Sequence, residues 1–217
     1  FNLQLDTGGM AMRKTGDEPI EFRGKDTGLR LRDFWSWGFS DLLDNTLRGS
    51  YAEFIVAAAL GIDLSEARVN WEPWDLTLGG IRVEVKSCSY LQAWEQKRPS
   101  AIQFSIRPAI RWSATAGWVG EQRRQSDVYV FCLFAEKDTE KADPMQLDSW
   151  VFYVLPTRAL DEHCGEQKSI SLNSLLKLGP ELVDFGELRA AVLRCVPCHE
   201  VKQDDDAGAS DGACERT

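Results

Sequence analysis

Residues 74–86 read WDLTLGGIRVEVK, and the pattern within this stretch decides the fold. Alternating apolar and polar residues on both sides of Gly79 and Gly80 are typical of a β-hairpin with a two-residue turn. In such a hairpin, residues whose numbers add up to 159 face each other, as 75 and 84 do. Asp75 is therefore expected opposite Glu84, with their Cβ atoms about 5 Å apart.

The same alternation assigns the residues of the second strand to two faces. Its apolar residues are expected in the core and its charged residues on the other face: Ile81, Val83 and Val85 against Arg82, Glu84 and Lys86. Two facing carboxylates destabilise a hairpin unless a positive group lies between them. Mg²⁺ or Mn²⁺, which prefer carboxylate oxygens, suit that position. Lys86, about 7 Å along the strand on the same face, is placed to orient a water molecule or to take its proton.

Outside this stretch, the chain predicts a mixed α/β fold. Apolar residues recur at helical spacing between residues 41 and 60, and Gly61 follows where a helix commonly ends. Strand patterns lie at 69–78, 81–86, 102–106, 127–134 and 150–155, and helix patterns at 172–178 and 185–193. One helix, several strands and then two helices predict a mixed central β-sheet flanked by helices.

Asp75 followed by Glu84-Val85-Lys86, with Glu53 on the preceding helix, resembles the PD-(D/E)XK nuclease superfamily and its restriction endonuclease-like fold. The resemblance covers about residues 46–155, although Trp74 stands where the family usually has proline. It implies that Asp75, Glu84, Glu53 and the carbonyl of Val85 bind a Mg²⁺ or Mn²⁺ ion. It also implies that Lys86 serves the water molecule that attacks the phosphodiester.

Glu53 has a second interpretation. Ser50-Tyr51-Ala52-Glu53 fits a capping box, in which Glu53 would bond the backbone at the start of a helix. The apolar spacing, however, continues upstream through Leu47, which favours a helix that begins earlier and leaves Glu53 in its middle.

Four residues are predicted to contact nucleic acid: Arg48, Gln92, Arg123 and Arg124. Arg48, about one turn before Glu53, either contacts phosphate or pairs with an acid. Gln92 follows Lys86 as an auxiliary residue does in some nuclease families, or is an ordinary polar loop residue. Arg123 and Arg124 end a segment in which arginine and tryptophan are interleaved. This composition suits phosphate contacts and base stacking, or a loop whose tryptophans close the core.

The composition limits the class of protein. The chain has 217 residues, 25 Lys and Arg against 34 Asp and Glu, and a net charge of −9. This charge argues against a protein that coats DNA in general, but it is compatible with an enzyme that has a local basic groove. No run of 18 apolar residues and no export signal is visible, so we expect no membrane contact, a cytoplasmic location and reduced cysteines.

We expect an irregular N-terminal segment at 1–33, a nuclease-like domain at 34–199 and an acidic disordered tail at 200–217. The chain begins with Phe1, and Met10 or Met12 could be the start of translation. Cys195-Val196-Pro197-Cys198-His199 offers zinc ligands or plain thiols, and no second pair of cysteines with this spacing is present.

The sequence thus predicts a metal-dependent nuclease that hydrolyses phosphodiester bonds in DNA. The alternative is a nuclease-like binding module without catalysis, or a subunit of a larger DNA defence or repair assembly. A protein partner or a homodimer is compatible with either.

Overall fold

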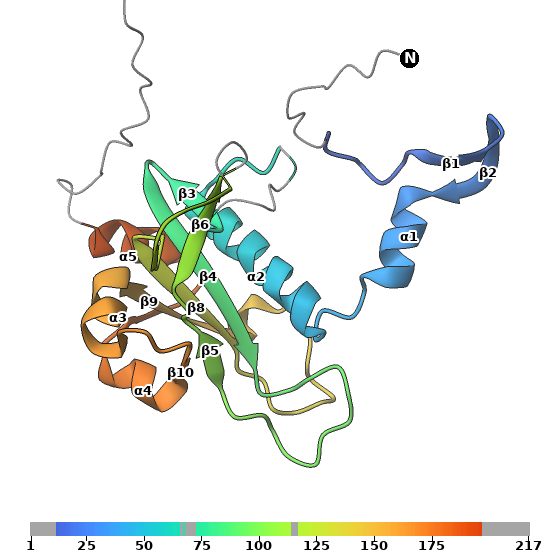
Figure 1. Cartoon of the computed structure of the whole chain (residues 1–217). Coiled ribbons are helices and arrows are strands. Elements are labelled where there is room, and N and C mark those ends of the chain that lie inside the picture. Colours follow the sequence, from blue (N-terminus) through green and yellow to red (C-terminus); the bar gives the residue numbers. More distant parts are fainter. Residues whose placement is uncertain (1–11, 66, 68–72, 114–116, 197–217) are drawn as a thin grey trace, which may run out of the picture.

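The computed structural model describes residues 12–65, 67, 73–113 and 117–196. A five-stranded mixed sheet lies at its centre (Figure 1), in the order β11-β9-β8-β4-β3. Its strands are β3 (Leu76–Leu78), β4 (Ile81–Ser89), β8 (Val128–Phe134), β9 (Trp150–Pro156) and β11 (Glu181–Val183). β4 and β8 run parallel, whereas the other neighbouring pairs are antiparallel.

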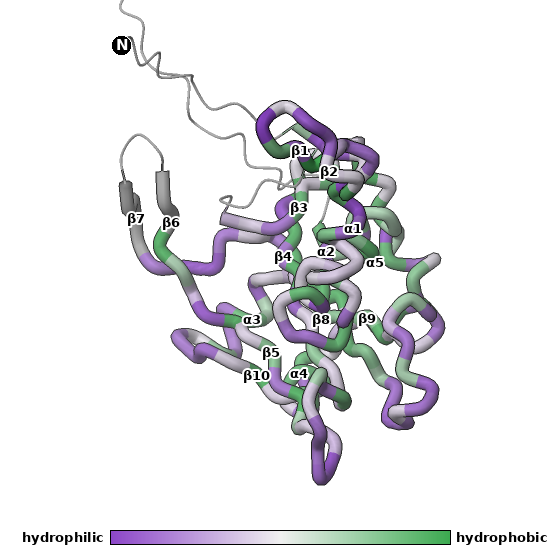
Figure 2. The backbone as a smooth tube through the Cα atoms, turned by 90° about the vertical axis from the view of Figure 1, so that its right-hand side faces the viewer, coloured by the Kyte–Doolittle hydropathy of each residue, from purple (hydrophilic) through white to green (hydrophobic). Residues whose placement is uncertain are grey.

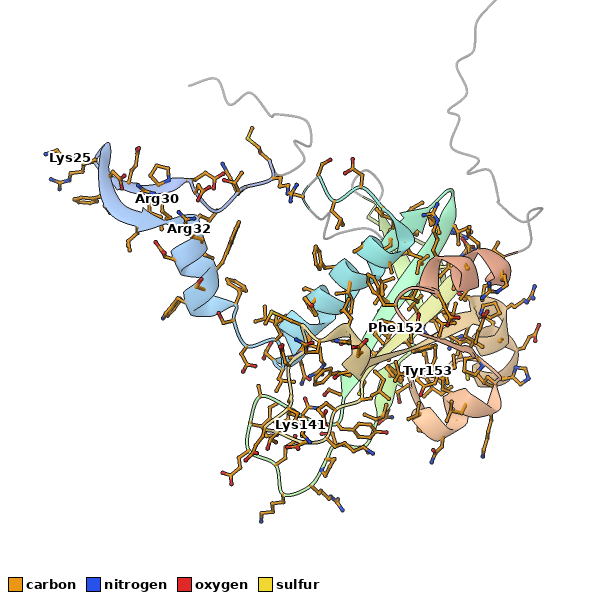
Figure 3. All side chains as sticks on the ribbon, turned by 180° about the vertical axis from the view of Figure 1, so that it is seen from behind. Lys25, Arg30, Arg32, Lys141, Phe152 and Tyr153 are labelled. Atoms are coloured by element: carbon orange, nitrogen blue, oxygen red, sulfur yellow. The ribbon has the colours of Figure 1, made fainter. Side chains whose placement is uncertain are left out.

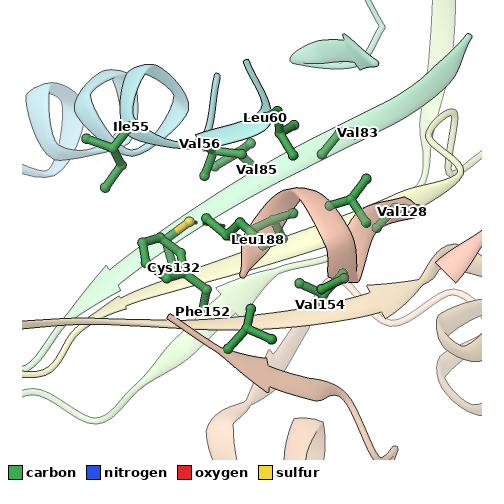
Figure 4. Close-up of a cluster of buried hydrophobic side chains, with 14 of the residues drawn as sticks. Ile55, Val56, Leu60, Val83, Val85, Val128, Cys132, Phe152, Val154 and Leu188 are labelled. Carbon is green, nitrogen blue, oxygen red and sulfur yellow. Dashed lines mark hydrogen bonds between the residues drawn. The ribbon is translucent and has the colours of Figure 1, made fainter. Parts of the chain in front are cut away.

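One face of the sheet is covered by helices α2 (Asn45–Leu60) and α5 (Leu188–Cys195). In the core on this face, the aliphatic side chains of α2 meet those of β4, β8 and β9 (Figure 4). Val83 and Val85 point into this core, with 0% and 5% of their surface exposed. Because Val83 and Val85 alternate with Glu84, the charged side chain of Glu84 is directed to the opposite face.

The other face is covered by shorter elements. They are β5 (Gln103–Ser105), α3 (Thr157–Cys164), β10 (Ser169–Ser171) and α4 (Leu172–Lys177). Every residue of β8 is buried, since this strand is covered on both faces. A 3₁₀ turn at Leu147–Ser149 precedes β9.

The predicted mixed α/β class with a central sheet is confirmed. The predicted strand at 69–78 is described only from residue 73 and is extended from Leu76, and the last helix begins three residues later than expected. Five strands and α-helices of this part of the chain were missed: α3, β10, β11, and the hairpin of β6 (Ala109–Ser113) and β7 (Gly117–Arg123). The hairpin lies in the segment of interleaved arginine and tryptophan, for which a loop was one of the two interpretations. Helix α3 carries Arg158, Asp161, Glu162 and His163, and these polar side chains obscure its apolar pattern.

The expectation of an irregular segment at 1–33 is wrong for residues 19–33. These residues form β1 (Pro19–Phe22) and β2 (Lys25–Arg30), followed by helix α1 (Leu31–Gly38). Arg23 and Gly24 have φ of 52° and 71°, which makes the chain reverse tightly between the two strands. Arg23 and Gly24 therefore permit a hairpin where irregular structure was expected. Hydrophilic and hydrophobic stretches alternate along it (Figure 2).

Two further expectations fall outside the described residues, wholly or in part. The tail at 200–217 is one, and Cys198 and His199 of the alternative zinc site are the other. Cys195 is described, and burial raises the pKa of its thiol to about 11. Among the described residues, no helix has the length and apolar character needed to cross a membrane.

Candidate active site

The predicted hairpin forms in the predicted register. Leu76 pairs with Val83 and Leu78 with Ile81, so facing residues do add up to 159. Gly79 and Gly80 have φ of 55° and 88°, as a tight turn with two left-handed residues requires. The paired register ends at Leu76 and Val83, and the backbone N–H of Asp75 donates to the carbonyl of Val83 at 3.1 Å, so Asp75 lies beside Glu84 at the end of the ladder and is not paired with it as predicted.

Asp75, Glu84 and Lys86 come together at this end of the hairpin. The Lys86 ammonium forms an ion pair with Glu84, and its Nζ lies 3.8 Å from Oδ2 of Asp75. The same Asp75 oxygen accepts a hydrogen bond of 2.7 Å from the backbone N–H of Val85. Asp75 and Glu84 have 20% and 19% of their side-chain surface exposed, and Lys86 has 26%. The three charged groups are thus largely withdrawn from water.

Glu53 lies in the middle of α2, as the apolar spacing indicated. The helix begins at Asn45, where Asp44 caps it by accepting hydrogen bonds from the N–H groups of Thr46 and Leu47. The capping-box interpretation of Glu53 is therefore wrong, because Ser50 is already inside the helix. The charge of Glu53 acts on both Glu84 and Lys86, which places a third carboxylate within electrostatic reach.

The electrostatics of the site reflect this crowding. Burial raises the pKa of the Glu84 carboxyl, and the charges of Asp75 and Glu53 raise it further against the opposing effect of Lys86. Burial alone would lower the pKa of Lys86, but the carboxylates of Glu84, Asp75 and Glu53 outweigh it and the pKa is raised. Lys86 is therefore a cation at neutral pH, beside a Glu84 carboxyl whose protonated form is favoured by burial and by the neighbouring acids.

The donor set suits a hard divalent cation. Carboxylate oxygens from Asp75 and Glu84, with Glu53 close by, are the ligand type that Mg²⁺ and Mn²⁺ prefer. Among the residues that the structure describes, however, no three His, Cys, Asp or Glu side chains are already gathered as a metal centre. The Lys86 ammonium lies against both hairpin carboxylates instead. A metal ion bound here would thus supply positive charge at the place where the Lys86 ammonium now lies against the carboxylates.

Sequence analysis missed the partner of Arg82, which shares the face of Glu84. The Arg82 Nε donates to Oδ2 of Asp127 at 3.0 Å, and the same oxygen accepts from the Arg82 backbone N–H at 2.9 Å. The guanidinium also lies 5.4 Å from the ring centre of Trp74. Since Asp127 is 45 positions away in the sequence, only the parallel pairing of β4 with β8 brings the two together.

Tyr129 is a second neighbour that sequence analysis missed. It pairs with Glu84 across β4 and β8 and is 3% exposed. Burial raises the pKa of its hydroxyl, and the charge of Glu84 adds to this shift. An uncharged hydroxyl therefore lies on the strand next to the acidic group.

Two of the four residues predicted to contact nucleic acid are buried. Arg48 is 3% exposed and donates to the carbonyl of Leu43 and to Oδ1 of Asn45. Arg124 is 7% exposed and bonds Asp161 and three backbone carbonyls: those of Ile106, Gly165 and Gln167. The contacts of Arg124 hold the segment before β8 against α3, which is a structural role. The structure does not bring either guanidinium to the surface beside the hairpin.

Gln92 and Arg123 are more accessible. The Gln92 amide donates to the carbonyl of Ser89 and to the hydroxyl of Ser100, so it stabilises the loop after β4. Arg123 is exposed at the end of β7, where its Nε lies 3.4 Å from Oε1 of Gln125. Neither side chain has a described contact with Asp75, Glu84 or Lys86.

Comparisons with known proteins add no family assignment. No protein-family model matches the chain, and no curated protein matches it significantly.

Proposed function

We propose that this protein is a metal-dependent nuclease that hydrolyses phosphodiester bonds in DNA, with a restriction endonuclease-like fold. The observation that carries the proposal is the meeting of Asp75, Glu84 and Lys86 at the edge of the sheet, with Glu53 in reach. These are the residues to which the resemblance assigns metal binding and the positioning of the attacking water.

The cost of this arrangement supports a functional role. Withdrawing carboxylates and an ammonium from water costs free energy that their mutual attraction does not always repay. Burial and the charges of Asp75 and Glu53 raise the pKa of Glu84, and the three acids raise the pKa of Lys86, which supports a crowded acidic site. Natural proteins break local rules of stability mainly at functional sites, so this hairpin is the best candidate for one.

Asp75, Glu84 and Glu53, together with the carbonyl of Val85, would hold the ion. When bound, a divalent cation supplies Lewis acidity, which polarises a phosphoryl oxygen and lowers the pKa of an attacking water molecule. The chain's own carboxylates would repel a phosphodiester, so the requirement for the cation is strict. The carboxylates would also fix the position of the cation on the hairpin.

Lys86 would act as a cation and not as a base. Its raised pKa keeps it protonated at neutral pH, so it can donate hydrogen bonds but cannot accept a proton. From its position beside Glu84, the ammonium can orient the attacking water and stabilise negative charge that develops at phosphorus. This argues against Lys86 as the group that removes the proton.

A subunit of a larger DNA-processing assembly is the second candidate. The burial of Arg48 and Arg124 and the net charge of −9 favour a protein that needs a partner for DNA affinity. In this case the hairpin would keep its chemistry, and activity would appear only with the partner present.

Cleavage assays test the proposal. Supercoiled plasmid, single-stranded DNA and RNA are incubated with the protein in Mg²⁺ or Mn²⁺, with EDTA as a control. We expect DNA cleavage that requires the metal and falls at least about a hundredfold in Asp75→Asn and in Lys86→Met. Glu181→Gln, on the opposite edge strand β11, is the matched control and should cut normally. Cleavage that persists in EDTA or in Asp75→Asn would refute this assignment of the site.

A further inference from the structure

The unit formed by β1, β2 and α1, residues 19–39, extends away from the rest of the molecule, and we call it the projecting arm. Figure 1 shows α1 beyond the N-terminal end of α2. Figure 3 shows the labelled arm residues Lys25, Arg30 and Arg32 well separated from Phe152 and Tyr153 in the body. None of the residues of α1 is buried.

The arm has too little packing to be stable by itself. An isolated helix needs about 12–15 residues to be even marginally stable in water, and α1 has eight. An isolated two-stranded hairpin is marginal as well. The arm nevertheless has regular hydrogen bonding, with the N–H groups of Leu31 and Arg32 donating to the carbonyls of Glu18 and Gly16. A further surface that packs against the arm is therefore needed to stabilise its regular structure.

The arm exposes apolar side chains to meet such a surface. Seven large ones are between 39% and 85% exposed: Ile20, Phe22, Leu29, Phe34, Trp35, Trp37 and Phe39. With about 200 Å² for a large apolar side chain, they leave on the order of 700 Å² uncovered. A stable interface buries about 800 Å² on each partner. One arm therefore comes close to what a specific contact needs.

Helix α2 offers a complementary surface on its outer side. From Gly49 to Leu60, Glu53 is its one charged residue, whereas a surface helix normally carries charges on its outer face. Phe54 is 53% exposed, with its ring 6.2 Å from that of Tyr51, and Ala58 is exposed as well. This composition is typical of a helix covered on both sides.

The connection between α1 and α2 directs the arm away from its own α2. Within Ser40–Asp44, the Ser40 hydroxyl donates to the carbonyl of Ser36 at 2.6 Å. Oδ1 of Asp41 accepts from the N–H of Leu43 at 3.0 Å, and the carbonyl of Asp41 accepts from the N–H of Asp44 at 3.1 Å. With these turns the arm lies beyond the N-terminal end of its own α2 (Figure 1), so an α2 surface that covers it would come from a second molecule.

We propose that two copies of this chain associate by exchanging their projecting arms, with α1 of each copy packed on the α2 surface around Phe54 of the other. A two-fold arrangement uses the same two surfaces twice and leaves neither uncovered. It places two exchanged arms in one interface, which brings the buried area into the range of a stable dimer. The proposal concerns association and does not depend on nuclease activity.

Sedimentation velocity of the full chain at micromolar concentration tests the exchange. We expect a dimer for the wild type and at least a tenfold increase in the dissociation constant for Trp37→Asp and for Phe54→Asp. Trp94→Asp is the matched control, because Trp94 is 58% exposed in the loop after β4 and lies outside both surfaces. It should remain dimeric. Circular dichroism confirms that each variant is folded, and Trp37, 85% exposed, can be replaced without disturbing the core.

A monomeric wild type would overturn the proposal and would leave a different protein, a nucleic acid or the chain's own body as the occupant of the arm. A dimer that survives both Trp37→Asp and Phe54→Asp would also overturn it. Neither result bears on cleavage by the hairpin site, which is measured separately.

Discussion

Two hairpins in this molecule each bring two carboxylates close to a cation. At β3–β4 the carboxylates are Asp75 and Glu84, which share Lys86, and in β1–β2 they are Glu21 and Asp26, which pair across the strands. Both hairpins turn through two residues of positive φ, and in both a nearby cation compensates the acids. Arg30 lies 3.0 Å from Asp26 in the arm, as Lys86 lies against Glu84 in the body.

The two pairs differ in burial, and burial reverses the direction in which the pKa of the carboxyl shifts. In the arm, the hydrogen bond from the Arg30 side chain and the N–H of Gly28 lower the pKa of Asp26. In the body, burial and neighbouring carboxylates raise the pKa of Glu84 although a lysine forms an ion pair with it. An exposed ion pair contributes little to stability, whereas a buried one has large opposing terms. The same sequence pattern thus gives a surface pair in one place and a candidate active site in the other.

We expect the largest difference in stability between the two hairpins when the cation of each hairpin is removed. Lys86→Met leaves Glu84 and Asp75 without their ammonium in a largely buried position, so the free energy of unfolding should fall by about 1–3 kcal/mol. Arg30→Met removes an exposed cation and should leave the unfolding of the body unchanged. Urea denaturation at pH 7 measures both. Equal effects of the two changes would show that burial does not separate the hairpins.

We expect a smaller loss of stability when a glycine in the turn of each hairpin is replaced by alanine. Gly79→Ala places a side chain at φ of +55°, with no atom within 4 Å to obstruct it, so the cost is backbone strain of about 1 kcal/mol. Gly24→Ala, at φ of +71° with open space around it, strains the arm similarly. We expect thermal denaturation to show a lower melting temperature of the body for Gly79→Ala alone. If both variants lower it equally, the arm is part of the same cooperative unit.

The smallest effect is expected when the charge of Glu84 is removed. Its folded pKa lies above the ordinary value of 4.5, so its contribution to stability is complete below that value and is lost as the pH rises through the raised pKa. Glu84→Gln should therefore match the wild type near pH 4 and be slightly more stable at pH 7, without added metal. Asp26→Asn should not be stabilised at pH 7. A Glu84→Gln variant that is less stable at pH 7 would mean that the pair with Lys86 dominates.

The sequence predicted the candidate site better than its surroundings. The register of the hairpin follows from Gly79 and Gly80 together with the alternation, which are local features, and the structure has that register. The position of Glu53 follows from helical spacing, also a local feature. Arg48 and Arg124 could not be placed in this way, because their burial depends on contacts with backbone carbonyls that folding brings close.

The arm was mispredicted for a related physical reason. Gly24 and Gly28 interrupt the apolar pattern, but their positive φ values fit a hairpin that has no core to reveal it. The pattern of alternation reports burial, so a hairpin without buried residues gives a weak signal. The pairing of Arg82 with Asp127 was equally inaccessible, since it depends on the order of strands in the sheet.

Calorimetric titration of the protein with Mn²⁺ tests most directly whether the hairpin carboxylates form a metal site. We predict a binding event in the wild type that is lost in Asp75→Asn and retained in Asp26→Asn, because only the largely buried pair has a fixed position for the ion. Absence of binding to the wild type, or equal binding to Asp75→Asn, would contradict the account.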